Sequence, residues 1–178
     1  MIVFITGGAK NGKSTYAQRL AGRLAGDGPR YYIATMIPVD EEDRDRIRRH
    51  IADRDGLGFE TVEQGRDILE CIPKVDRNAS FLLDSVTALL MNELFLPPDY
   101  HLNPEAGEKC ARELAQFSRC VKNIVLVSDY LYSDALRYDE TTEIYRKALA
   151  GIDRKLAEIS DVVLELSAGN VIVHKGDS

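Results

Sequence analysis

Residues 7–14 read Gly7-Gly8-Ala9-Lys10-Asn11-Gly12-Lys13-Ser14, which matches the pattern G-x-x-x-x-G-K-[ST] at every position. An apolar run, Ile2–Thr6, precedes this loop, and a helix-forming run that begins with Thr15 follows it. This order predicts a strand, a loop of backbone amides around phosphate oxygens, and a helix whose positive end faces the same oxygens. The sequence therefore predicts a site for a nucleoside triphosphate.

Each part of the loop has its own expected role. Glycine lacks a Cβ, so Gly7, Gly8 and Gly12 allow the backbone to approach the phosphates closely. Lys13 is expected to place a cation on the β- and γ-phosphates, and Ser14 to offer a hydroxyl to Mg²⁺. The nucleotide-binding residues predicted from this segment are Gly7, Gly8, Ala9, Lys10, Asn11, Gly12, Lys13, Ser14 and Thr15.

Composition narrows the class of protein. A length of 178 residues suits one domain, residues 1–178, and the net charge of −6 argues against broad nucleic-acid binding. We expect no membrane span, because no apolar run reaches the necessary length. Cys71, Cys110 and Cys120 show no metal-like spacing, which favours reduced thiols and a cytoplasmic location.

Apolar runs alternate with amphipathic stretches along the chain, and this predicts an α/β fold with a mostly parallel sheet. Ala168-Gly169-Asn170 predicts a hairpin turn, so we expect the last strand to be antiparallel. The expected strands are Ile2–Thr6, Tyr31–Thr35, Phe59–Glu63, Phe81–Asp84, Ile124–Ser128, Val162–Leu166 and Val171–His174. The expected helices are Lys13–Gly26, Glu41–Arg54, Gly65–Cys71, Val86–Phe95, Pro104–Val121 and Glu140–Ser160.

A second nucleotide-binding element is expected at Asp84, which ends an apolar strand. An acid in this position is the usual partner of a phosphate loop and binds magnesium directly or through water. We therefore predict that Ser14 and Asp84 form the metal site.

The charged stretch Asp40–His50 allows two interpretations. It is typical of a solvated helix with pairs of opposite charge one turn apart. Alternatively, Arg46 and Arg49 hold a triphosphate while they keep the imidazole of His50 neutral and nucleophilic, so that it can attack phosphorus.

Taken together, these segments resemble one family, the bifunctional adenosylcobinamide kinase/adenosylcobinamide-phosphate guanylyltransferases of cobalamin biosynthesis. The resemblance spans nearly the full length and rests on segments that occur in order, the last of which, Leu149–Asp153 with Leu156-Ala157, is similar to the family's penultimate helix. The segments before it are the phosphate loop, Tyr32-Ile33-Ala34-Thr35, Arg46-Ile47-Arg48-Arg49-His50, Thr61-Val62-Glu63, and Leu83-Asp84-Ser85-Val86-Thr87 with Asn92 beyond. The third segment matches the family's R-I-x-x-H, whose histidine carries the guanylyl group.

The resemblance implies a P-loop NTPase fold of the RecA type, with a seven-stranded sheet and a trimeric assembly. It implies phosphorylation of adenosylcobinamide by ATP or GTP, followed by transfer of GMP from GTP to the phosphorylated corrinoid. Lys13 and His50 would be the catalytic residues, and Arg46, Arg49, Glu63 and Asp84 would join the phosphate loop in nucleotide binding.

The chain departs from the family after the fifth strand. Ser128–Ala135 contains neither Gly nor Pro, whereas the family carries an Asn-Glu-Val-Gly stretch that ends in Ile-Val-Pro. We expect this segment to determine which acceptor is used, not whether a nucleotide binds. Two alternatives stay open, namely a P-loop kinase of another small molecule and a nucleotide-sensing protein that has lost catalysis.

Overall fold

The computed structural model describes residues 1–177, and it contains a seven-stranded sheet in the order β3-β2-β4-β7-β1-β8-β9. All neighbouring strands are parallel except β8 and β9, which are antiparallel. The predicted α/β class and mostly parallel sheet are confirmed. Ser178, the last residue of the predicted domain, lies outside the described residues. The strands of this sheet are β1 Ile2–Gly7, β2 Arg30–Ala34, β3 Phe59–Glu63, β4 Ser80–Asp84, β7 Asn123–Val127, β8 Val162–Ser167 and β9 Asn170–Lys175.

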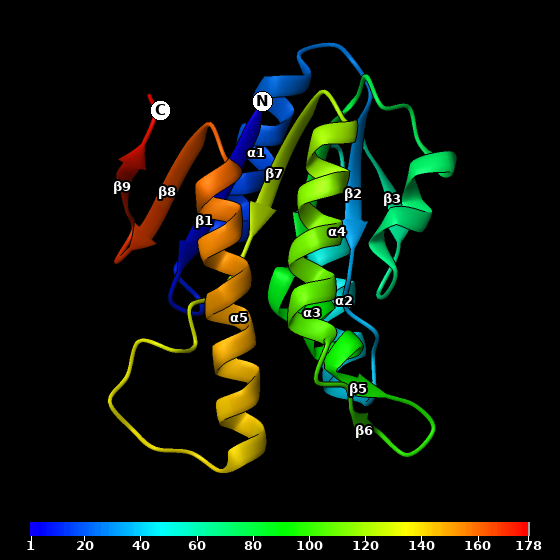
Figure 1. Cartoon of the computed structure of the whole chain (residues 1–178). Coiled ribbons are helices and arrows are strands. Elements are labelled where there is room, and N and C mark those ends of the chain that lie inside the picture. The colour runs from blue at the N-terminus through cyan, green and yellow to red at the C-terminus, as the bar shows by residue number, and fades with distance from the viewer. Residues whose placement is uncertain (178) are drawn as a thin grey trace.

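Helices cover both faces of the sheet (Figure 1). On one face, Val3 and Ile5 of β1 belong to the same core cluster as Ala17 and Ala21 of α1. On the other face, Phe4 belongs to the cluster that includes residues of α3, α4 and α5. Burial on both faces explains why the central strands are nearly continuous in apolar residues. The α-helices are α1 Lys13–Ala25, α2 Glu41–Asp53, α3 Val86–Leu94, α4 Ala106–Cys120 and α5 Glu140–Ile159.

The C-terminal hairpin forms at the predicted turn. Ala168 and Gly169 have φ angles of 48° and 79°, so both residues adopt the left-handed conformation that a tight two-residue hairpin requires. Ser167 pairs with Asn170 across this turn, and β9 becomes the antiparallel edge strand.

One local expectation was wrong, and one small element was not expected. The predicted helix Gly65–Cys71 is instead a 3₁₀ helix, η1, at Ile68–Lys74. It begins after Asp67, whose φ is 48°, and it contains Pro73, which lacks the N–H that an α-helix interior needs. The small antiparallel hairpin of β5 Phe95–Leu96 and β6 His101–Leu102 was not predicted from the sequence.

Over residues 1–177, none of the helices has both the length and the apolar character needed to cross a bilayer.

The parallel strands end at a common edge, and this edge gathers the predicted site. The phosphate loop follows β1, Asp84 ends β4, and Asp129 comes shortly after β7. In Figure 1 the carboxyl ends of these strands point downwards, toward α2 and the long segment 128–139. Ligands of open α/β sheets commonly bind at such an edge.

Candidate functional site

The backbone of the phosphate loop has the conformation that its glycines allow. Gly7 has a φ of 152°, and a Cβ at this position would lie 2.3 Å from the carbonyl oxygen of Leu166. Gly12 has a φ of 81° and caps the N-terminus of α1 without a side chain. The loop thus leads directly into the N-terminus of α1, where backbone amides are expected to bind phosphates.

Lys13 is almost fully buried, with 5% of its side chain exposed. Its ammonium donates a hydrogen bond to the carbonyl of Gly8 at 2.6 Å. It also forms an ion pair with the carboxylate of Asp129 at 2.5 Å. The lysine predicted to bind phosphates is thus held by an acid of the segment that follows β7.

Asp84 lies between the phosphate loop and the helix that carries His50. It accepts a hydrogen bond from the hydroxyl of Tyr32 at 3.2 Å. Burial raises the pKa of Asp84, and the charge of Asp129 adds to this effect, whereas Ser14, His50 and Tyr32 oppose it. The Ser14 hydroxyl and the Asp84 carboxylate are neighbouring oxygen donors, which is the chemistry that Mg²⁺ prefers. The two residues predicted to hold the metal therefore fit that role.

A cavity of about 360 Å³ lies beside Asp84. It brings together three residues predicted from the sequence, His50, Glu63 and Asp84, which are far apart along the chain. The other polar or charged residues that line it are Tyr32, Arg44, Arg48, Arg54 and Ser85. Its size is in the range of small-molecule sites.

Helix α2 carries His50, which lines this cavity. Asp40 caps its N-terminus by accepting a hydrogen bond from the amide of Asp43 at 2.8 Å, and acidic residues fill the first turn. Ile47 and His50 are half-buried and line the cavity. All thirteen residues of α2 are exposed or half-buried, so the helix covers the site without entering the core.

The structure places Arg46 and Arg49 differently from the sequence-based expectation. Both are exposed, and neither belongs to the lining of the cavity. Arg49 contributes to a separate hollow that also includes Arg48. A nucleotide-binding role for Arg46 and Arg49 stays a prediction, since their contact with a bound nucleotide would require a ligand that extends beyond the cavity.

Sequence reasoning missed Arg54 and Tyr32, which form one wall of the cavity. The guanidinium of Arg54 lies over the ring of Tyr32, 4.0 Å from its centroid. Arg54 follows His50 by four residues, and this helical spacing is the signal that could have placed both on one face. Tyr32 gives no such signal, because its contact with Asp84 depends on the pairing of β2 with β4.

A hydrogen bond and an ion pair connect the segment 128–139 to α5. The hydroxyl of Tyr132 donates to the carboxylate of Asp153 at 2.8 Å, and Arg146 forms an ion pair with Asp134 at 3.0 Å. Burial raises the pKa of Asp153 to about 6, and the charge of Asp129 adds to this effect, although the hydroxyls of Ser128 and Tyr132 oppose it. The predicted acceptor segment therefore has a fixed course beside the phosphate loop.

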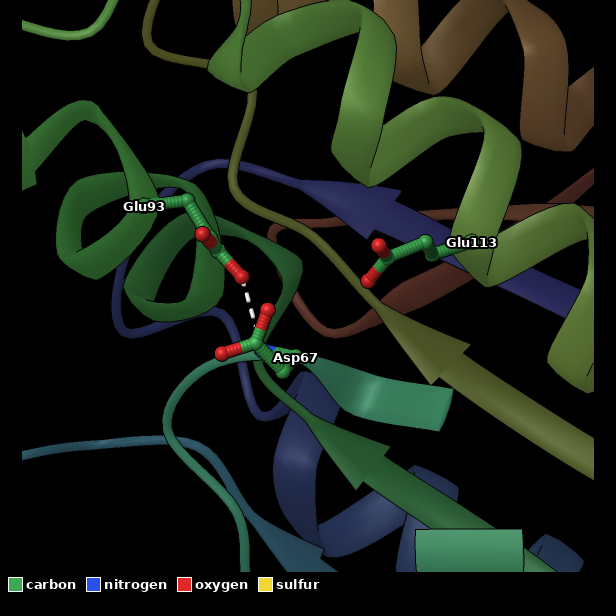
Figure 2. A group of neighbouring side chains, drawn as sticks. All are labelled: Asp67, Glu93 and Glu113. Atoms are coloured by element: carbon green, nitrogen blue, oxygen red, sulfur yellow. Dashed lines mark hydrogen bonds between the residues drawn. The ribbon is translucent and has the colours of Figure 1, made fainter. Parts of the chain in front are cut away.

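A cluster of three acidic residues, Asp67, Glu93 and Glu113, lies outside the lining of the cavity (Figure 2). Glu93 is 3% exposed and accepts a hydrogen bond from the amide of Asp67 at 2.7 Å. The ammonium of Lys109 lies 2.5 Å from Asp67 and 2.6 Å from Glu93. Partial burial lowers the pKa of Lys109, but these two carboxylates outweigh it and leave the pKa above its ordinary value. A lysine thus compensates the acids and ties η1 to α3 and α4.

Comparison with known proteins gives one family for nearly the whole chain. The model of a family described as cobinamide kinase / cobinamide phosphate guanyltransferase matches residues 3–173. A protein of Salmonella typhimurium is 27% identical over 183 residues, and one of Escherichia coli is 28% identical over 182 residues. Each alignment covers 95% of this chain and 97% of the relative. Both relatives are named bifunctional adenosylcobalamin biosynthesis protein CobU.

Solved structures of other proteins share the fold. A KaiC-like protein of Pyrococcus horikoshii aligns with a TM-score of 0.56 and 15% identity, over 99% of this chain and 80% of that protein. A DnaB-like replicative helicase aligns with a TM-score of 0.56 and 11% identity, over 98% of this chain and 52% of the helicase chain. At these identities the likeness concerns the fold alone, which is that of a P-loop NTPase.

Proposed function

Because the chain belongs to the cobinamide kinase / cobinamide phosphate guanyltransferase family, we propose that it carries out both reactions in cobalamin biosynthesis. In the first, the γ-phosphate of ATP or GTP moves to the hydroxyl of adenosylcobinamide. In the second, GMP moves from GTP to adenosylcobinamide phosphate through a guanylyl-histidine at His50. Residues 1–178 would act as one catalytic unit.

One observation carries this proposal. The phosphate loop, Asp84 and His50 converge at one edge of the sheet, and His50 and Asp84 line the same cavity of about 360 Å³. A phosphate loop alone would support any P-loop kinase. A histidine that shares a cavity with the second acid of the nucleotide site supports a nucleotidyl transfer in addition.

In the kinase step, the acceptor hydroxyl attacks the γ-phosphorus, and the bond to the β-phosphate oxygen breaks. Lys13 and the loop amides stabilise the negative charge on the transferring oxygens. Lys13 leaves its ion pair with Asp129 to do so, which frees a carboxylate beside the reacting group. Asp129 is then placed to accept the proton of the acceptor hydroxyl.

Ser14 and Asp84 would hold a magnesium ion, which neutralises charge on the phosphates when it is bound. Their proximity and their oxygen donors support this assignment.

In the guanylyl transfer, an imidazole nitrogen of His50 attacks the α-phosphorus of GTP. A nitrogen–phosphorus bond forms, and the bond to pyrophosphate breaks. The phosphate of adenosylcobinamide phosphate then attacks the same phosphorus, which releases His50 and yields adenosylcobinamide-GDP. Splitting the transfer into two displacements predicts ping-pong kinetics.

We further propose that Ser128–Ala135 contributes to acceptor recognition. Its ties to α5 through Tyr132 and Asp134 give the segment a defined shape next to Lys13. A trimeric assembly, which the family resemblance implies, is part of the same proposal and can be measured by light scattering.

The decisive experiment uses GTP labelled at the α-phosphate, with Mg²⁺, followed by denaturation and peptide mapping. We expect label on His50, labile in acid and stable in base as a phosphoramidate is. His50→Ala should lose this label and keep phosphoryl transfer to adenosylcobinamide, because Lys13 and Ser14 remain.

The alternatives predict other results. A P-loop kinase of another small molecule would phosphorylate its substrate without any label on the protein. A nucleotide sensor would bind GTP tightly and show no turnover with a corrinoid. Label that persists in His50→Ala would contradict the guanylyl-histidine.

A further inference from the structure

Arg54 is a buried cation whose hydrogen-bond partners are uncharged. It is 8% exposed. Its guanidinium donates to the carbonyl of His50 at 2.7 Å and to the hydroxyl of Thr61 at 3.2 Å. Over residues 1–177, no carboxylate lies within ion-pair distance of it. A buried charge without a counter-charge is costly, which indicates that an anion completes the site.

The ring of Tyr32 holds this guanidinium in place. It stacks on the ring of Tyr32, and the Tyr32 hydroxyl in turn donates to Asp84. Burial and the charge of Asp84 raise the pKa of Tyr32, and the charge of Arg54 opposes this shift. Tyr32 therefore remains a hydrogen-bond donor and joins Arg54 to the nucleotide site.

Donors remain available on Arg54. A guanidinium carries five N–H groups, and the described residues accept hydrogen bonds from two of them. Arg54 lines the cavity together with His50 and Asp84. Its unused donors can therefore reach a ligand that also reaches His50.

The chemistry of the cavity favours a phosphate as this ligand. Two further arginines, Arg44 and Arg48, line it, although both are paired with Glu41 and Arg48 is also paired with Asp45. A rigid planar guanidinium suits two oxygens of one phosphate group, which a lysine ammonium cannot match in geometry.

We propose that Arg54 binds a phosphate group of GTP during attack by His50, and that the same side chain positions His50 through its backbone carbonyl. This inference rests on the proposed guanylyl transfer and adds a phosphate-binding residue to it. It also explains why an arginine four residues after His50 is buried on the wall of the cavity.

The test compares the variants Arg54→Gln and Arg54→Lys. The control is Arg119→Gln, because Arg119 is an exposed residue of α4. Glutamine keeps hydrogen-bond donors but removes the charge, whereas lysine keeps the charge but not the planar fork. The GTP concentration that half-saturates labelling of His50 is measured for each variant, together with phosphoryl transfer and the melting temperature.

Charge-assisted hydrogen bonds contribute about 1.5–3 kcal/mol, so Arg54→Gln should raise the half-saturating GTP concentration by roughly tenfold to a hundredfold. Arg54→Lys should recover part of this loss. The Arg119→Gln variant should match the wild type. If Arg54→Gln folds and labels His50 with an unchanged GTP dependence, Arg54 only caps the helix and the inference is wrong.

Binding of inorganic tripolyphosphate, measured by calorimetry, separates this inference from the proposed function. If the wild type acquires no guanylyl label, the transferase proposal fails. A weaker affinity of Arg54→Gln for tripolyphosphate would still support the anion site, and an equal affinity would overturn it. If Arg54→Gln does not fold, the same comparison is made with Arg54→Lys, for which an affinity equal to the wild type would refute the two-oxygen contact.

Discussion

The ammonium of Lys13 lies 2.5 Å from the carboxylate of Asp129, although 115 intervening positions separate the two residues in the chain. The contact joins the first turn of α1 to the segment after β7. A triphosphate bound at the phosphate loop, as proposed above, would compete with Asp129 for Lys13. On this proposal, the ion pair would couple nucleotide binding to the release of the Asp129 carboxylate near the γ-phosphate.

Lys13→Ala should abolish the kinase step. The variant removes the main cation of the phosphate loop, and we expect phosphoryl transfer to fall at least about a hundredfold. Transfer of labelled γ-phosphate to adenosylcobinamide measures the effect. Near-normal transfer would contradict the assignment of Lys13 to the β- and γ-phosphates.

Asp129→Asn should act on both substrates, which revises the expectation that this segment affects the acceptor alone. The amide keeps the shape but weakens the hold on Lys13, so nucleotide affinity should rise modestly. The turnover number of the kinase step should fall at least about tenfold, because the proton acceptor is lost. Steady-state kinetics and nucleotide titration separate the two effects. Reduced affinity with normal turnover would assign Asp129 to nucleotide binding only.

Asp84→Asn should weaken the dependence of turnover on magnesium. The substitution preserves the size of the side chain and removes the charge that the metal requires. Activity is measured over a range of Mg²⁺ concentrations, with Asp27→Asn, an exposed substitution, as control. An unchanged half-saturating concentration would exclude Asp84 from the metal site and make Asp129 the next candidate.

Lys109→Met should destabilise the fold without touching the nucleotide site. It leaves Glu93, which is 3% exposed, without its cation, and breaking such a buried pair costs about 3–5 kcal/mol. Urea unfolding measures the loss, and Lys155→Met, at a more exposed pair, is the control. Adding Glu93→Gln should restore part of the stability. No recovery in the double variant would mean that Lys109 stabilises the fold by other contacts.

Asp153 should make stability depend on pH. Its pKa is raised to about 6 in the folded state, so the protonated form is favoured by folding. The corresponding stabilisation is fully present below about pH 4 and is lost as the pH rises through 6, by on the order of 3 kcal/mol. Asparagine lacks this titration and still accepts a hydrogen bond from Tyr132.

The measurement for Asp153 is urea unfolding of the wild type and Asp153→Asn at several pH values from 4 to 8. Relative to the variant, the wild type should lose stability as the pH rises through this window. Parallel curves would show that Asp153 titrates alike in the folded and unfolded chain.

The strands were predictable because their signal is local. Runs such as Phe81–Leu83 are apolar on both faces, and the turn at Gly169 determines the direction of the last strand. The segment 65–74 was harder, since its apolar spacing suits an α-helix while Pro73 and the left-handed Asp67 prevent one. The amino-acid sequence of this segment does not show whether the helical apolar spacing or the two helix-breaking residues will decide its conformation.

Motifs in the sequence named Lys13, His50 and Asp84, and the fold brings the phosphate loop, His50 and Asp84 to one edge of the sheet, while their roles in binding and catalysis stay predictions. The charged contacts within the site could not be predicted from the sequence. The pairing of Lys13 with Asp129 and the stacking of Arg54 on Tyr32 arise from strands and helices that meet only in the folded chain. Arg46 and Arg49 looked equally suitable in the sequence, but the turn of α2 places them outside the cavity.

Helix α2 differs from the other helices in how little the core constrains it. The helices α1, α3, α4 and α5 all bury several residues, whereas α2 buries none. Its ends are held by hydrogen bonds, from the Asp43 amide to Asp40 at the start and from Arg54 to the His50 carbonyl at the end. Its outward face should therefore tolerate substitution with little loss of stability. Charges on that face can be exchanged to tune the electric potential at the mouth of the cavity, a property that a protein engineer could adjust separately from folding.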